Sequence, residues 1–127
     1  MPVGYDGAAC GFLDPPIAQA LSTMECNKNS SSGGPVTARY SLFPDRVSLN
    51  NQFREIVKYP QQWVPCPGDK DSPISWNNPS SGESGQVACG IYNNRPNIAW
   101  TTESKLFLAD VQGDGSLAQL HQWWQSV

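Results

Sequence analysis

The chain has 127 residues, of which 39% are hydrophobic and 15% charged, and its formal net charge is −3. This length predicts one domain, 1–127, with a core of modest size. The eight Lys and Arg are scattered, so no basic stripe is available for nucleic acid or for an anionic membrane surface. No apolar run reaches the length of a membrane span.

The N-terminus does not read as a signal peptide, because it lacks a basic segment followed by an apolar one. If the domain is exported, we expect the export or membrane-anchoring element to lie upstream of Met1. Met1 would then be a start added to a fragment.

The four cysteines, Cys10, Cys26, Cys66 and Cys89, are widely spaced and form no Cys-x-x-Cys pair. This spacing excludes a zinc knuckle and a thioredoxin-like redox site. An even count in a short, charge-poor, loop-rich chain favours disulfides and an extracytoplasmic location, with four buried free thiols as the alternative. Of the three pairings, we favour Cys10–Cys26 and Cys66–Cys89, each of which closes a moderate loop worth about 3 kcal/mol in the chain-entropy model.

The first half of the chain predicts one strand and two helices. We expect 1–15 to be irregular and 16–23 to form a short helix. Alternating apolar and polar residues predict a strand at 38–43. Asp45 is suited to cap a helix that ends near Lys58. The apolar face of this helix would carry Leu49, Phe53, Ile56 and Val57.

The second half is richer in strands, which we expect at 63–66, 75–77, 85–92, 97–101 and 106–111. A turn at 93–96 would join two of them into a hairpin. Ser116 is suited to cap a final helix. Its apolar face would carry Leu117, Leu120, Trp124 and Val127.

This order predicts an α+β fold in which the helices pack on one face of an antiparallel sheet. Period-two alternation in the strands predicts the sheet core, which we expect to contain Tyr40, Leu42, Val87, Cys89, Ile91, Ile98, Trp100, Leu106 and Leu108. The helices would contribute Phe53, Ile56, Leu120 and Trp124.

No motif predicts a catalytic residue, a metal site or a cofactor. His121, the only histidine, has no nucleophile elbow in the sequence, so a structural role is favoured. Segment 110–121 begins like a calcium loop but places Gln112 and His121 at two of the ligand positions. The loop carboxylates show no spacing that singles out a glycosidase pair: Asp69, Asp71, Glu83 and Glu103.

The tryptophans offer large apolar side chains that suit either a core or a sugar-binding platform, and core packing is the commoner role. Trp76 lies in the polar segment 67–85, and Trp123 lies to one side of the final apolar stripe, where we expect it to be exposed. Trp76 and Trp123 are therefore the candidate partner surface. The sequence identifies no ligand-binding residue.

Five segments are distinctive: GGPVTARYSLFPD at 33–45, VPCPG at 64–68, GQVACG at 85–90, NIAWT at 97–101 and LHQWW at 120–124. Together they resemble the extracytoplasmic C-terminal domains of certain mycobacterial transmembrane serine/threonine protein kinases. Similar segments occur in small actinobacterial lipoproteins. The resemblance covers nearly the whole chain, from Cys10 to Trp124.

The resemblance implies an extracytoplasmic sensor role, with the kinase and its membrane helix upstream. The partner would be an unidentified extracellular ligand or protein, and a homodimer of the receptor would transmit the signal. The chain itself lacks the HRD, DFG and Gly-rich motifs of a kinase, so it is not predicted to be an enzyme. The alternatives are a standalone cell-envelope lipoprotein-type binding module and a secreted hydrolase.

Overall fold

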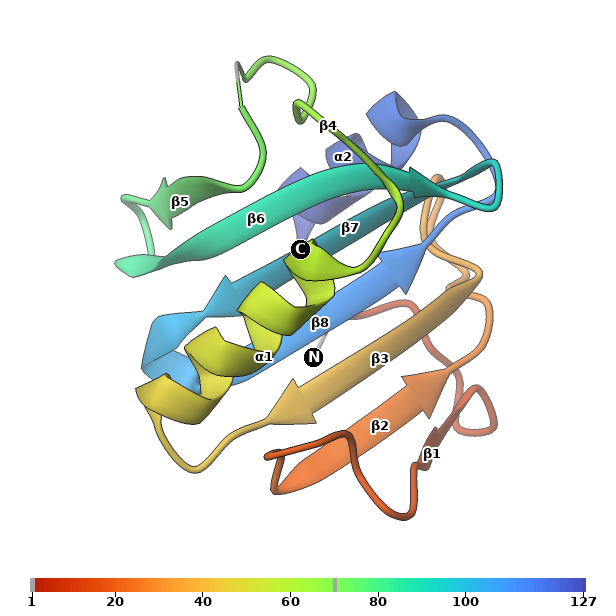
Figure 1. Ribbon diagram of the computed structural model, residues 1–127. Helices are drawn as coiled ribbons and strands as arrows, with labels where there is room; N and C mark the ends of the chain where they lie inside the picture. The colour runs from red at the N-terminus through yellow and green to blue at the C-terminus, as the bar shows by residue number, and fades with distance from the viewer. Residues whose placement is uncertain (1, 70) are drawn as a thin grey trace.

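The computed structural model describes residues 2–69 and 71–127, which form an eight-stranded antiparallel sheet with two α-helices (Figure 1). The helices are α1 (Arg46–Lys58) and α2 (Leu117–Ser126). The strands are β1 (Cys10–Phe12), β2 (Ser22–Cys26), β3 (Thr37–Leu42), β4 (Gln62–Val64), β5 (Ile74–Asn78), β6 (Glu83–Tyr92), β7 (Arg95–Thr102) and β8 (Phe107–Gln112). Their order is β1-β2-β3-β8-β7-β6-β4, and β5 pairs with β6 beside β4.

Local sequence signals set the ends of both helices and the central hairpin. The Asp45 side chain accepts a hydrogen bond from the Ser48 N–H at 2.8 Å and caps α1. Ser116 and Gln119 form a reciprocal capping box at the start of α2. Asn93 and Asn94 adopt φ of 52° and 63°, the left-handed conformation that a two-residue hairpin turn between β6 and β7 requires.

The two helices pack on opposite faces of the sheet, with α1 in front of it and α2 behind it in Figure 1. We call these the α1 face and the α2 face. In β7, Ile98 and Trp100 belong to the α2-face cluster, whereas Ala99 between them belongs to the α1-face cluster. The expectation that the helices share one face is wrong, because the central strands are apolar on both faces and each face needs its own cover.

Both disulfides join the cysteines that the sequence predicted, Cys10 with Cys26 and Cys66 with Cys89. The first pair are ladder partners in β1 and β2, and the second ties the segment after β4 to β6. Two disulfides indicate an oxidising, extracytoplasmic environment.

The expected helix at 16–23 is wrong. The described residues there form turns that lead into β2, and β1 lies within the stretch expected to be irregular. Backbone bonds explain the difference, because the Leu21 N–H donates to the Leu42 carbonyl and the Ile17 N–H donates to the Thr23 hydroxyl. Pairing with β3 satisfies the groups that a helix would otherwise bond.

Most expected core residues are buried, namely Tyr40, Val87, Cys89, Ile98, Trp100, Leu108, Phe53 and Leu120. Those at the margins of the helices and sheet are half-buried: Ile56, Ile91, Leu106 and Trp124. Leu42 is 46% exposed, against expectation. It ends β3, and α2 covers β6 and β7 rather than this strand.

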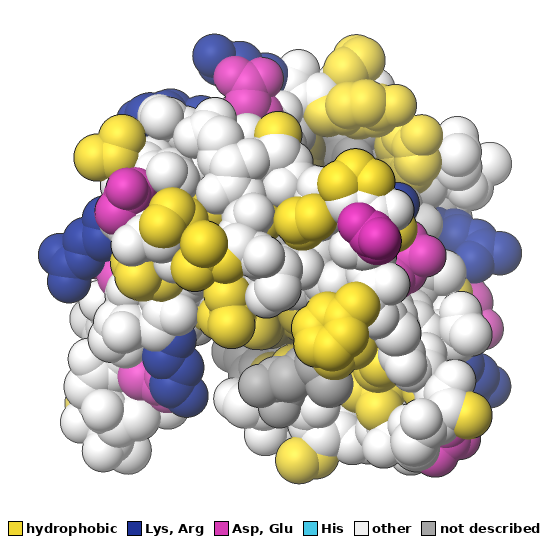
Figure 2. Space-filling view, turned by 90° about the horizontal axis from the view of Figure 1, so that it is seen from below, with side chains coloured by type: hydrophobic (Ala, Val, Ile, Leu, Met, Phe, Trp, Pro, Cys, Tyr) yellow, Lys and Arg dark blue, Asp and Glu magenta, His cyan; other side chains and the backbone are white. Residues whose placement is uncertain are grey.

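The face seen from below, next to β1 and β2, carries hydrophobic side chains scattered among polar ones (Figure 2). Lys and Arg side chains lie near Asp and Glu around its rim, and the Arg39–Glu25 pair at 2.9 Å joins β3 to β2. This face therefore presents mixed charge rather than a basic stripe.

Trp123, expected to be exposed, is only 4% exposed and packs edge-to-face on Trp100 with ring centroids 6.2 Å apart. Replacing it by alanine would leave a large cavity under α2, so we expect Trp123→Ala to lower the free energy of unfolding by about 3–5 kcal/mol in urea titrations. The neighbouring exposed Gln122→Ala is the control. A loss below about 0.5 kcal/mol, as for surface substitutions, would contradict this packing.

Candidate functional site

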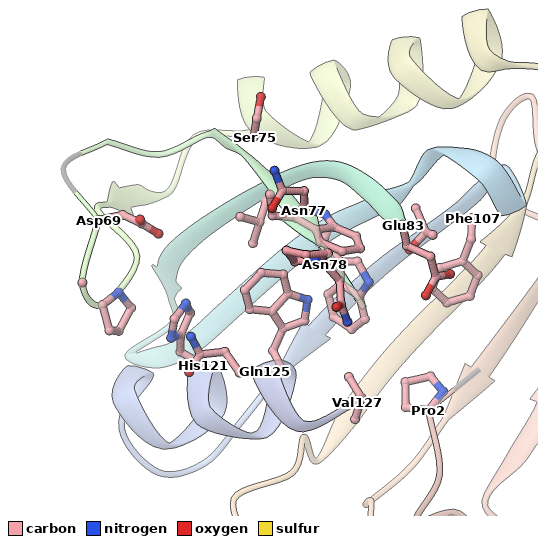
Figure 3. Close-up of a pocket in the computed structure, with 18 of the residues that line it drawn as sticks. Pro2, Asp69, Ser75, Asn77, Asn78, Glu83, Phe107, His121, Gln125 and Val127 are labelled. Atoms are coloured by element: carbon pink, nitrogen blue, oxygen red, sulfur yellow. The ribbon is translucent and has the colours of Figure 1, made fainter. Parts of the chain in front are cut away.

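A cleft of about 690 Å³ opens on the α2 face, between β5 and α2 (Figure 3). Four elements contribute its aromatic lining, which consists of Trp76, Trp100, Phe107 and Trp124. Polar side chains surround this lining and include Asp69, Asn77, Asn78, Glu83, Lys105, His121 and Gln125. We call this site the aromatic cleft. Aromatic side chains combined with convergent polar groups are typical of small-molecule sites.

The lining belongs to a continuous row of rings that crosses the sheet. Trp76 meets Trp124 edge-to-face at 5.9 Å between centroids, and Trp124 meets Trp100 at 6.2 Å. The row then continues at centroid distances of 6.4, 5.9 and 5.9 Å through Phe107, Tyr40 and Tyr5. Each ring packs against the next, so the aromatic lining is already ordered in the absence of a ligand.

Backbone geometry fixes the position of Trp76. Its indole N–H donates to the Thr101 carbonyl at 2.9 Å, and its ladder partner in β6 is Gly85. A Cβ on Gly85 would collide with that same carbonyl oxygen. The glycine therefore permits the close approach of β6 to the Thr101 carbonyl. Because the indole N–H is already bonded to that carbonyl, Trp76 offers a ligand its ring surface and no hydrogen-bond donor.

His121 and Asp69 face each other at one end of the cleft (Figure 3). A ring nitrogen of His121 and a carboxylate oxygen of Asp69 lie within 4.8 Å. His121 is only 5% exposed, and its Nε2 has no hydrogen-bond partner within 2–69 and 71–127. Burial lowers the pKa of His121, and the Asp69 carboxylate opposes this shift. Burial therefore favours the neutral imidazole at neutral pH, and its buried Nε2 is left without a hydrogen-bond partner among the described residues.

The second disulfide positions Asp69. Cys66 is bonded to Cys89 in β6, and the Asp69 N–H donates to the Cys66 carbonyl at 2.9 Å. Gly68 between them adopts φ of 86°, a left-handed conformation that favours glycine. The disulfide thus anchors the short turn at 66–69 to the sheet, and this turn places Asp69 close to α2.

The Cys66 sulfur lies beside Asp69 and His121, but this cluster does not make a metal site. The sulfur is bonded to Cys89 and is not a thiolate. One carboxylate and one imidazole are too few for a protein zinc site, which has three or four protein ligands.

A second cleft, of about 750 Å³, lies on the α1 face, and we call it the polar cleft. Asp110 there accepts a hydrogen bond from the Asn97 amide at 2.7 Å, and Asn97 in turn accepts one from Gln61 at 2.9 Å. Arg39 is bonded to Glu25. Burial raises the pKa of Asp110, against the opposing effects of Asn97 and Arg39. The polar side chains of this cleft hydrogen-bond to one another, whereas the aromatic cleft contains the unpartnered Nε2 of His121. We therefore take the aromatic cleft as the candidate site.

The structure separates the two residues of the candidate partner surface. Trp76 is half-buried and lines the aromatic cleft, but Trp123 lies beneath α2 and offers no surface. Trp100 contacts both Trp123 and Trp124, so both of these adjacent tryptophans lie on the side of α2 that packs against the sheet.

The sequence did not predict that Asp69 and His121 lie face to face in the cleft. It placed Asp69 among loop carboxylates without a paired partner and favoured a structural role for His121. The usable signal was the position of Asp69 three residues after Cys66, because a crosslinked cysteine fixes its neighbours. Nothing in the sequence indicated which helix face would meet that turn.

The environment of His121 predicts its titration. As the only histidine, it gives one set of imidazole NMR signals, and we expect their midpoint below the ordinary value of 6.5 because burial disfavours the imidazolium. Asp69→Asn removes a charge that favours the imidazolium, so the midpoint should fall further. The exposed Asp71→Asn in the same loop is the control. A midpoint at or above 6.5 would contradict the described burial.

The raised pKa of Asp110 means that the folded state binds this proton more tightly than the unfolded chain. The carboxylate therefore costs stability above its folded pKa, and the cost disappears as the pH falls below its unfolded value. We expect Asp110→Asn to raise the free energy of unfolding at about pH 7, with the gain shrinking toward about pH 4. Urea titrations across this range, with the exposed Asp114→Asn as control, test the prediction. A gain that grows as the pH falls would contradict it.

No helix within the described residues is long and apolar enough to cross a membrane. No family model, curated protein or solved structure matches the chain.

Proposed function

We propose that the chain is the extracytoplasmic sensor domain of a membrane-anchored serine/threonine protein kinase, and that its ligand binds in the aromatic cleft. The observation that carries the proposal is the combination of a pre-positioned aromatic lining with a buried, unpartnered nitrogen of His121 in one cleft. An orphaned buried polar atom beside a cavity is expected where a ligand completes the hydrogen bonding.

Two further observations support the proposal. The disulfides suit a domain outside the cytoplasm. The five distinctive segments resemble sensor domains of mycobacterial kinases, and four of these segments, 64–68, 85–90, 97–101 and 120–124, carry residues that line the cleft. The proposed role is binding rather than catalysis, and the kinase activity would belong to another part of the receptor.

Signal transmission in this proposal uses association of two receptors. The two crosslinks and the row of packed rings oppose a large internal rearrangement. A ligand bound between α2 and the 67–85 segment would instead change the outer surface, where loops carry binding function. Homodimerisation would then bring two tethered kinase domains together.

The test is autophosphorylation of the native full-length protein in intact cells across growth conditions. We expect Trp76→Ala to abolish the change in autophosphorylation between conditions, because it removes one wall of the cleft. Trp63→Ala is the matched control, since Trp63 is a half-buried tryptophan that packs in the α1-face cluster. An unchanged response in Trp76→Ala would reject the cleft as the sensing site. A native gene that encodes a lipobox upstream, and no kinase, would favour the lipoprotein-type binding module.

A further inference from the structure

We propose that the aromatic cleft binds a neutral pyranose glycan, with a sugar ring against the tryptophan lining and a sugar hydroxyl hydrogen-bonded to Asp69 and His121. The inference rests on the proposed function in that it takes the ligand to occupy this cleft, and it adds the chemical class of the ligand. Three properties of the described residues carry it.

The first property is the shape and chemistry of the lining. Trp76 and Trp124 are half-buried and stand nearly perpendicular, with an interplanar angle of 88°. Because the Trp76 N–H is bonded to Thr101, the ring surface is what remains for contact. A pyranose has an apolar C–H face that suits an indole ring and a polar edge of hydroxyls. Amphipathic ligands of this kind need both an aromatic surface and nearby polar groups.

The second property is the spacing of Asp69 and His121. A ring nitrogen of His121 and a carboxylate oxygen of Asp69 lie within 4.8 Å of each other, so one ligand oxygen beside them can reach both groups. A hydroxyl can donate its one hydrogen to the Asp69 carboxylate and at the same time accept a hydrogen bond from the N–H of a neutral imidazole. It would thereby satisfy the Nε2 of His121, which has no partner in the described chain. A quaternary ammonium or an alkyl chain offers no such group.

The third property is the charge of the cleft. Lys105 lies 3.2 Å from Glu83, so the basic side chain is already paired. Asp69 remains as a carboxylate beside an imidazole whose burial disfavours a positive charge. An anionic ligand, such as a phosphate or a uronic acid, would face this carboxylate at the same end of the cleft. The amides of Asn77, Asn78 and Gln125 add neutral hydrogen-bonding groups around the rim.

The experiment is a titration of the intact chain with maltotriose, mannotriose and chitotriose, followed by tryptophan fluorescence and by the NMR signals of the single imidazole. We expect at least one trisaccharide to give saturable changes in both signals. Asp69→Asn should weaken its binding about tenfold, since a hydrogen bond to a charged group is lost. Trp76→Ala should abolish binding. The controls Asp71→Asn and Trp63→Ala should bind as the wild type does, and circular dichroism checks that each variant is folded.

Three results would overturn the inference: no saturable binding of any trisaccharide at millimolar concentration, binding that Asp69→Asn leaves unchanged, or preferential binding of tetramethylammonium or of a sulfated glycan offered in parallel. Failure of the glycan inference is distinguishable from failure of the sensor role. If Trp76→Ala abolishes the cellular response but no trisaccharide binds, the sensor role stands and the ligand class is wrong. If a trisaccharide binds but the cellular response persists in Trp76→Ala, the ligand class stands and the sensor role is wrong. Hydrolysis of the bound trisaccharide would contradict the non-catalytic role alone.

Discussion

The side chain of Trp100 joins the hydrophobic core to the candidate site. It lies in the central strand β7, is 4% exposed, and contacts the rings of Trp123, Trp124 and Phe107. Through these contacts it holds α2 against the sheet and supports the lining of the aromatic cleft. A loss of packing at this position would therefore disturb the core, the helix and the cleft together.

The two faces of the sheet have different roles because their central side chains differ in size. On the α1 face the central positions are small, with Ala88 and Ala99 as ladder partners, and α1 packs closely over them with Leu49 and Phe53. On the α2 face they are large, and the ten-residue α2 leaves rings uncovered beside β5. The short α2 over large side chains thus leaves the aromatic cleft, whereas the longer α1 covers the small central side chains of the other face.

The segment between β4 and β5 shows how a loop-rich chain still holds a defined site. It contains few apolar side chains, so its own packing would not fix it. The Cys66–Cys89 bond and the turn from Cys66 to Asp69 supply that restraint, while β5 pairs with β6 and carries Trp76. The cleft therefore lies between two crosslinked or paired elements and α2, which suits recognition without large rearrangement.

The sequence favoured the observed disulfide pairing over two alternatives, and by itself it determined both capped helices, the β6–β7 hairpin and most of the buried positions. These features depend on neighbours in the chain: a capping side chain, two asparagines in a turn, or alternation along one strand. The tertiary structure decided that β1 and β2 join the sheet, that the helices take opposite faces, that Trp123 is buried, and that Asp69 faces His121. These outcomes depend on which strand edges and faces remain uncovered once the chain has folded. Periodicity reports that a helix has an apolar side, but only the assembled sheet determines which surface that side will cover.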